Sequence, residues 1–331
     1  MNLSILRKCL WRWGNVAFIT VVLSAFIIAT PQADRPVISW TPPPARLKVK
    51  TPFAPRPSEG GNIFKGDADR WLAVAATNLE AGNREPVADA VVTEYVSRVG
   101  KNLGAYSAAP TKSYEFIVLD DQEADSYTAG GGIVYITLGM LRMVESEDEL
   151  AGLLAHEIAH DAFHHAATTV TRQLFWMTGV TKVNTPDEVE SALRALYQEY
   201  RRKPLAEIAE SLIGFSRFHE LEADRAAFYT IYKAGYNPRG LATVLKRLES
   251  KNKKELGKDY PTHQLVKLLL GSHPLTAQRS LALSWESNFV KMPPKDSRCS
   301  SPAFEVMKVR VAQPWVIEKS ETNRVGPHSG S

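Results

Sequence analysis

The chain has 331 residues, which allows one large domain or two small ones with a sizeable buried core. Its formal net charge of +4 is too small to indicate a nucleic-acid partner, and its basic residues are dispersed. The only cysteines are Cys9 and Cys299, which argues against both a disulfide-stabilised scaffold and a structural thiolate metal site.

Residues 1–33 have the pattern of a targeting segment. Arg7, Lys8 and Arg12 precede an apolar run over residues 16–29. A basic start before a short apolar core is typical of a secretory signal, and a full membrane span needs about 20 residues. We expect residues 1–33 to be a signal anchor or a cleaved signal peptide. The rest of the chain would then lie outside the cytoplasm, in the periplasm of a Gram-negative source, with the membrane as one partner if the segment stays attached.

Residues 34–65 are predicted to be an extended linker, because eight prolines lie between positions 31 and 60. A folded domain is expected over residues 66–290. Its first two helices are predicted from Asp67 onward and over residues 87–103, from the helical spacing of their apolar residues.

Two strands are predicted next, over residues 114–119 and 132–137, from short apolar runs rich in β-branched and aromatic residues. Between them, Gly130, Gly131 and Gly132 indicate a turn or a close approach of the backbone. The fold class is therefore α+β, with mainly helices and a small sheet.

The string His156-Glu157-Ile158-Ala159-His160 is the strongest chemical signal in the chain. Ser146 and the acids at 147–149 predict a capped helix start before it. Residues four apart share a helix face, so His156 and His160 can direct their imidazoles at one metal ion. Glu157 projects beside that metal, where its carboxylate can act as a base toward water. The alternative is a core helix with two hydrogen-bonded histidines.

The third metal ligand is predicted at Glu220, because a catalytic zinc usually takes three protein ligands. Glu220 and Asp224 lie four apart on a helix predicted over residues 217–234, so they share a face. Asp224 could accept the second N–H of a ligating histidine and fix its tautomer. His219 and Glu222 point elsewhere, by about 100° per residue, and are interpreted as surface or packing residues.

The remaining segments carry weaker signals. His164 and His165 are interpreted as a histidine pair at a helix end. The apolar stretch 174–177 (LFWM) predicts core packing or, alternatively, docking on a membrane. Further elements are predicted as helices over residues 187–213, 238–250 and 276–285, and a strand over residues 303–311 within a tail of residues 291–331.

Four segments together resemble the zinc endopeptidases related to the CAAX prenyl protease and the HtpX heat-shock protease, over residues 67–285. The matching segments are residues 126–141 (SYTAGGGIVYITLGML), residues 156–160 (HEIAH), residues 216–224 (SRFHELEAD), and His273-Pro274 with Arg279. Many members of this family have Arg-His where this chain has His164-His165. His165 therefore matches, and the role of His164 stays open.

The resemblance implies a gluzincin, in which two histidines and one glutamate hold the zinc, with a mainly helical zincin-type fold and a small sheet beside the zinc helix. One Zn²⁺ per subunit is expected, held by His156, His160 and Glu220. Glu157 would be the general base. His273 is expected either to stabilise the oxyanion or to act as a reversible extra metal ligand, and Arg279 to orient its segment.

We therefore expect a zinc-dependent metalloendopeptidase, with a role in protein quality control at a membrane implied by the resemblance. The predicted strand at 132–137 could pair with an extended or unfolded protein or peptide through main-chain hydrogen bonds. The residues assigned to this pairing are Gly132, Ile133, Val134 and Tyr135. Two alternatives remain: a zinc hydrolase of non-peptide amides, and a non-catalytic, zinc-stabilised binding protein for unfolded clients. Glu157 argues against the binding protein, because holding zinc does not require it.

Overall fold

The computed structural model describes residues 62–80, 85–202, 205–255, 277–294 and 300–313. The predicted targeting segment, nearly all of the predicted linker and the His273-Pro274 pair lie outside the described residues. Within the described ranges, no helix combines the length and the apolar character needed to cross a membrane.

Three short strands form the sheet, one more than the apolar runs predicted. They are β1 (Glu115–Leu119), β2 (Ser126–Gly130) and β3 (Ile133–Thr137). The additional strand, β2, has the sequence SYTAG, in which only Tyr127 and Thr128 favour a strand. The order is β1-β3-β2, with β3 parallel to β1 and antiparallel to β2. Both edges of β3 are therefore occupied by neighbouring strands.

The two faces of the sheet contact different helices, because successive side chains of a strand point to opposite sides. Tyr127 and Tyr135 lie on one face and share an apolar cluster with Ala73 of α2 (Asp67–Glu80). Val134 and Ile136 lie on the other face. They join the main core with α3 (Ala90–Ala105) and α5 (Glu147–Ala162).

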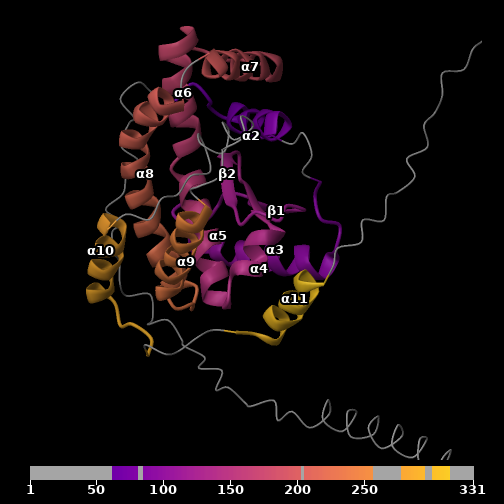
Figure 1. The fold of residues 1–331 in the computed structure, drawn as a ribbon, viewed down its shortest axis with the longest axis vertical. Helices are drawn as coiled ribbons and strands as arrows, with labels where there is room; N and C mark the ends of the chain where they lie inside the picture. The colour runs from indigo at the N-terminus through magenta and orange to yellow at the C-terminus, as the bar shows by residue number, and fades with distance from the viewer. Residues whose placement is uncertain (1–61, 81–84, 203–204, 256–276, 295–299, 314–331) are drawn as a thin grey trace, which may run out of the picture. The chain divides into compact units, whose positions relative to one another are not determined.

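Helix α5 is surrounded by the other elements of the domain (Figure 1), and its residues from Glu147 to Asp161 are all buried. It begins where the sequence predicted, because Ser146 Oγ accepts the N–H of Glu149. Gly152 allows a close neighbour: a Cβ there would lie 2.8 Å from the Cα of Leu241 in α9 (Arg239–Glu255). The helix that carries the His-Glu-x-x-His string is therefore fixed by packing on several sides.

Three acids in the first turn of α5 tie it to other parts of the chain. Tyr95 Oη donates to Glu147 Oε1 at 2.8 Å, the N–H of Asn237 donates to Asp148 Oδ1 at 2.8 Å, and Arg247 Nη2 donates to Glu149 Oε1 at 2.9 Å. Buried carboxylates need such donors, and negative charge is favourable at a helix N-terminus. These bonds fix the position of the helix start.

The predicted helices at 187–213 and 217–234 are divided differently in the structure. Helix α7 covers Pro186–Arg202, and α8 covers Leu205–Lys233 without interruption at 214–216. Residues 203 and 204, between the two helices, lie outside the described residues. Helix α8 packs along α5 (Figure 1), and this contact sets the geometry of the site described below.

Helix α6 (His165–Thr178) packs with α2 and α7 in a second apolar cluster. Of the stretch 174–177, Leu174 is fully buried in this cluster and Met177 packs against it. Phe175 and Trp176 are 54% and 73% exposed. Core packing is therefore confirmed for half of the stretch, and membrane docking by the two exposed rings stays a prediction.

The segment predicted as a strand at 303–311 is a helix, α11 (Pro302–Ala312). Ser301 accepts the N–H of Phe304, and proline suits the first helical position. Phe304, Met307 and Val311 follow helical spacing and belong to the main core. Lys308 Nζ donates to the carbonyls of residues 141, 142 and 144, at the end of α4 (Leu138–Met143). The predicted domain boundary at 290 is thus too early.

Candidate metal centre

Three buried side chains converge where α5 meets α8. His156 and His160 lie one turn apart on α5, and their Nε2 atoms are 3.0 Å from each other. Each Nε2 lies 3.3 Å from one oxygen of Glu220 on α8. One ligand atom from each of the three residues lies within 4.8 Å of the other two. Two imidazoles and a carboxylate at this spacing fit the donor set of a catalytic divalent metal.

Asp224 and Arg279 lie behind His156, as the predicted helix spacing suggested for Asp224. Asp224 Oδ1 is 3.1 Å from His156 Nδ1. Arg279, from α10 (Ala277–Glu286), donates to both oxygens of Asp224 at 2.6 and 2.7 Å. Its third nitrogen, Nη1, lies 2.8 Å from Glu220 Oε2. Because Arg279 is only 1% exposed, this one guanidinium neutralises two buried acids and fixes their positions.

The surroundings of the two histidines shift their pKa values in opposite directions. Burial lowers the pKa of His156, but hydrogen bonds to Asp224 and Glu220 outweigh it and raise the pKa to about 9. Burial dominates at His160, whose pKa lies well below its usual value. At Asp224 burial raises the pKa, yet the bonds from Arg279 and His156 prevail and lower it.

His160 has a different support, which the sequence did not predict. Its Nδ1 lies 3.0 Å from Nδ1 of His165, the first residue of α6. Nε2 of His165 lies 3.2 Å from Glu222 Oε2 on α8. The ring of His219 stacks on His165 with 4.0 Å between centroids and 6° between planes. Packing is thus confirmed for His219. Glu222 instead contacts His165, which in turn contacts the candidate ligand His160. Burial lowers the pKa of His165, which favours its neutral form.

Glu157 follows His156 on α5, is buried, and connects α5 to the sheet. Ser126 Oγ donates to Glu157 Oε1 at 2.9 Å. Since Ser126 is the first residue of β2, this strand begins against the site. The sequence had identified Glu157 from its motif position but had no signal for its hydrogen bond to Ser126.

The predicted pairing of substrate with Gly132, Ile133, Val134 and Tyr135 is wrong, because β1 and β2 occupy both edges of β3. The error arose because strand order depends on contacts between distant residues, which an apolar pattern does not encode. Of the two edge strands, β2 packs against α5 and provides Ser126.

The glycine turn and His164 belong to a cluster next to the metal centre. Two acids accept hydrogen bonds from the turn: Asp161 Oδ1 from the N–H of Gly132 at 2.8 Å, and Asp69 Oδ2 from the N–H of Gly131 at 3.0 Å. Lys112 bridges the same two acids, with its Nζ 2.7 Å from Asp161 Oδ2 and 3.3 Å from Asp69 Oδ2. His164 has a left-handed backbone with φ 55° and separates α5 from α6, which agrees with its interpretation as a helix-end residue. Its Nδ1 is 3.4 Å from Asp69 Oδ2, and this hydrogen bond raises the pKa of His164.

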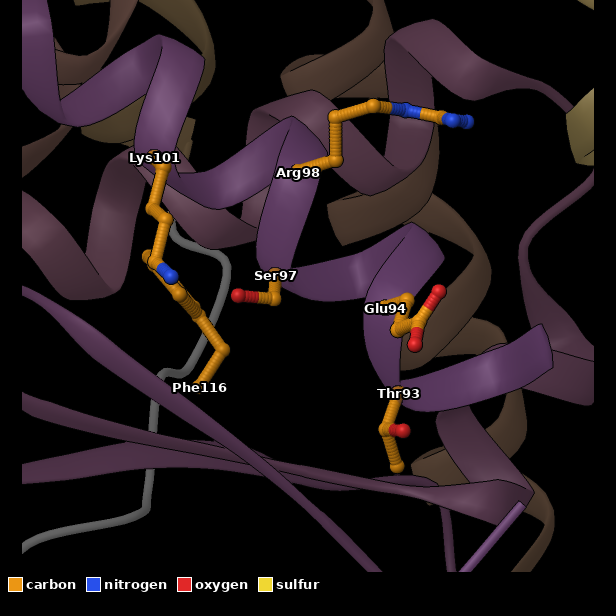
Figure 2. Close-up of a pocket in the computed structure, with 6 residues that line it drawn as sticks. All are labelled: Thr93, Glu94, Ser97, Arg98, Lys101 and Phe116. Carbon is orange, nitrogen blue, oxygen red and sulfur yellow. The ribbon is translucent and has the colours of Figure 1, made fainter. Parts of the chain in front are cut away.

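A separate surface pocket of about 600 Å³ lies between α3 and β1 (Figure 2). It is lined by Thr93, Glu94, Ser97, Arg98, Lys101 and Phe116. None of these residues belongs to the metal centre, and the lining carries charges of both signs.

Comparison with known proteins relates the chain to peptidases. It is 24% identical over 176 residues to the β-barrel assembly-enhancing protease of Escherichia coli, covering 50% of this chain and 34% of that protein. It is 24% identical over 232 residues to the mitochondrial metalloendopeptidase OMA1 of Arabidopsis thaliana, covering 69% and 44% respectively. It is 26% identical over 201 residues to the metalloprotease YcaL of Escherichia coli, covering 58% and 75%. The chain thus spans about a third of the length of the β-barrel assembly-enhancing protease.

Residues 90–286 match Peptidase family M48. This range covers more than half of the chain and includes both helices that carry the candidate ligands. The chain therefore belongs to peptidase family M48.

Proposed function

We propose that this protein is a zinc-dependent metalloendopeptidase. One observation carries the proposal: His156, His160 and Glu220 form a three-donor set, and the helix that carries both histidines also carries the buried carboxylate of Glu157 directly after His156. Three protein ligands leave a fourth zinc position for water or substrate, whereas structural zinc sites usually have four protein ligands. Membership of peptidase family M48 supports the same reaction class.

The chain's own residues divide the work of hydrolysis. Zinc, when bound, supplies Lewis acidity that polarises the scissile carbonyl and activates a water molecule for attack. Glu157 takes a proton from the attacking water and delivers it to the leaving amine as the C–N bond breaks. Ser126 holds Glu157 Oε1 and thereby fixes the direction of the carboxylate. Asp224 and Arg279 keep His156 and Glu220 in ligating positions.

The substrate in this proposal is a protein or peptide in an extended or unfolded conformation. Its backbone would add to the edge of β2 that does not pair with β3, because β2 begins at Ser126, which contacts Glu157. A role in protein quality control is consistent with the name of the β-barrel assembly-enhancing protease, which matches 50% of this chain. The basic flank of Arg7, Lys8 and Arg12 supports attachment to a membrane and an extracytoplasmic domain.

The test compares the purified protein with Glu157→Gln on an unfolded, reduced protein, with zinc content measured in both. Glutamine keeps the shape of the side chain and its contact with Ser126 but removes the base. We expect full zinc content and a loss of about 10²–10⁴ in turnover. Equal turnover in the two proteins would overturn the proposed role of Glu157. Wild-type protein that binds the unfolded protein without cleaving it would support the non-catalytic alternative.

His273 belongs to the same proposal through the His273-Pro274…Arg279 resemblance. If it stabilises the oxyanion, His273→Ala should cost about 10²–10³ in turnover with zinc retained. If it covers the metal at rest, the same substitution should raise activity, so the sign of the change separates the two roles.

A further inference from the structure

We propose that His165 and Glu222 form a two-step hydrogen-bond relay that fixes the tautomer and the ring orientation of His160. The relay consists of the contacts His160 Nδ1 to His165 Nδ1 and His165 Nε2 to Glu222 Oε2. It rests on the proposed function only in assuming that a metal binds His160 through Nε2. His165 and Glu222 would act on the metal through His160, as positioning residues.

The direction of each hydrogen bond follows from the position of the metal site. His160 Nε2 faces Glu220 and His156, so it must supply its lone pair to the metal. A neutral imidazole carries one N–H, which leaves the proton of His160 on Nδ1 as a donor. His165 Nδ1 must then accept this proton, so the proton of His165 lies on Nε2 and points at Glu222. Each ring therefore has one consistent tautomer.

The relay gives His160 a support of the same kind that Asp224 gives His156. A metal-bound histidine that donates its second N–H to an acceptor is held in orientation and becomes a better electron donor. For His156 the acceptor is a carboxylate, and Arg279 partly neutralises it. For His160 the acceptor is the imidazole of His165. The carboxylate of Glu222 contacts the other nitrogen of that ring and thereby makes His165 a stronger acceptor.

Three helices hold the relay in place. His160 is on α5, His165 begins α6, and Glu222 is on α8. His219, one turn before Glu222 on the same helix, stacks in parallel on His165 and restricts the rotation of its ring. Packing alone would require only a ring of similar volume at position 165, whereas the relay requires its two nitrogens and the acid at 222.

The test is the zinc dissociation constant at fixed pH, measured by competition with a chelator on the full chain. His165→Leu, which removes both nitrogens, should weaken zinc binding by about 10–100-fold. Glu222→Gln should weaken it several-fold and add almost nothing in the His165→Leu background, because Glu222 acts only through His165. His165→Asn should recover part of the affinity, since its amide oxygen can accept from His160 Nδ1. His164→Asn is the matched control, because His164 contacts Asp69 rather than the relay, and should keep wild-type affinity.

A second readout separates the relay from a packing role. In the zinc-loaded protein, the exchangeable imidazole N–H protons should give downfield NMR signals, and Glu222→Gln should shift the signals of His160 and His165. The apo form of Glu222→Gln should unfold at the same urea concentration as the apo wild-type protein. Wild-type affinity and spectrum in Glu222→Gln, or additive losses in the double variant, would overturn the relay. Zinc binding that survives His160→Ala unchanged would instead overturn the proposed metal site, and the relay with it.

Discussion

Arg279→Lys tests how strongly the buried acids behind the metal centre depend on one guanidinium. Arg279 makes three charged hydrogen bonds of 2.6–2.8 Å to Asp224 and Glu220, and it is 1% exposed. Lysine keeps the positive charge but has a single nitrogen, which cannot reproduce the planar three-bond contact. Hydrogen bonds to charged groups contribute about 1.5–3 kcal/mol each, so losing two of them should cost about 3–6 kcal/mol.

The assay is urea unfolding of the metal-free protein, with zinc affinity measured separately by chelator competition. Arg310→Lys is the matched control, because Arg310 pairs with Asp89 while its side chain is 45% exposed. Exposed ion pairs contribute about 0–1 kcal/mol, so the control should lose little stability. Arg279→Lys should also weaken zinc binding about 10-fold, since Asp224 would no longer be held against His156. A loss of stability no greater than that of Arg310→Lys would refute the reasoning.

Two further predictions concern the end of the domain and its pH dependence. Phe304→Ala in α11 should reduce the free energy of unfolding by about 3–5 kcal/mol, whereas Val306→Ala, at a 56% exposed position, should change it by less than about 0.5 kcal/mol. Equal effects in urea unfolding would mean that α11 is not part of the core. The hydrogen bond between His164 and Asp69 raises the pKa of His164 above 6.5 in the folded protein. The stability that this bond contributes is below about 1 kcal/mol, because the His164 side chain is half-exposed. It is fully present below pH 6.5 and is lost as the pH rises through the raised pKa. The difference in unfolding free energy between wild type and His164→Asn should therefore shrink from pH 6 to pH 9, and a difference that grows with pH would contradict this.

The candidate ligands could be predicted from sequence because each depends on local helix geometry. The pairs His156/His160 and Glu220/Asp224 both lie four residues apart, and that spacing alone places each pair on one face. Whether the two faces meet depends on the packing of α8 along α5, for which the four family-like segments were the only indication.

The residues that the sequence missed depend on the packing of several elements at once. His165 reaches His160 because the chain turns at His164, and Glu222 reaches His165 because α8 passes both α5 and α6. The position of β3 between two strands is also set by distant contacts. Helix α11 is different, since its signals were local. Ser301-Pro302 is a helix-start pair, and Phe304, Met307 and Val311 have helical spacing, but the valines between them favoured a strand.

The most direct test of the proposed metal centre is the zinc content of purified wild-type protein and of Glu220→Ala. Wild-type protein should carry about one zinc per chain, as a three-ligand catalytic site requires. Glu220→Ala should lose most of it, because two histidines remain and the carboxylate that faces both of their Nε2 atoms is gone. Full zinc retention in Glu220→Ala would contradict the ligand assignment on which the proposed reaction depends.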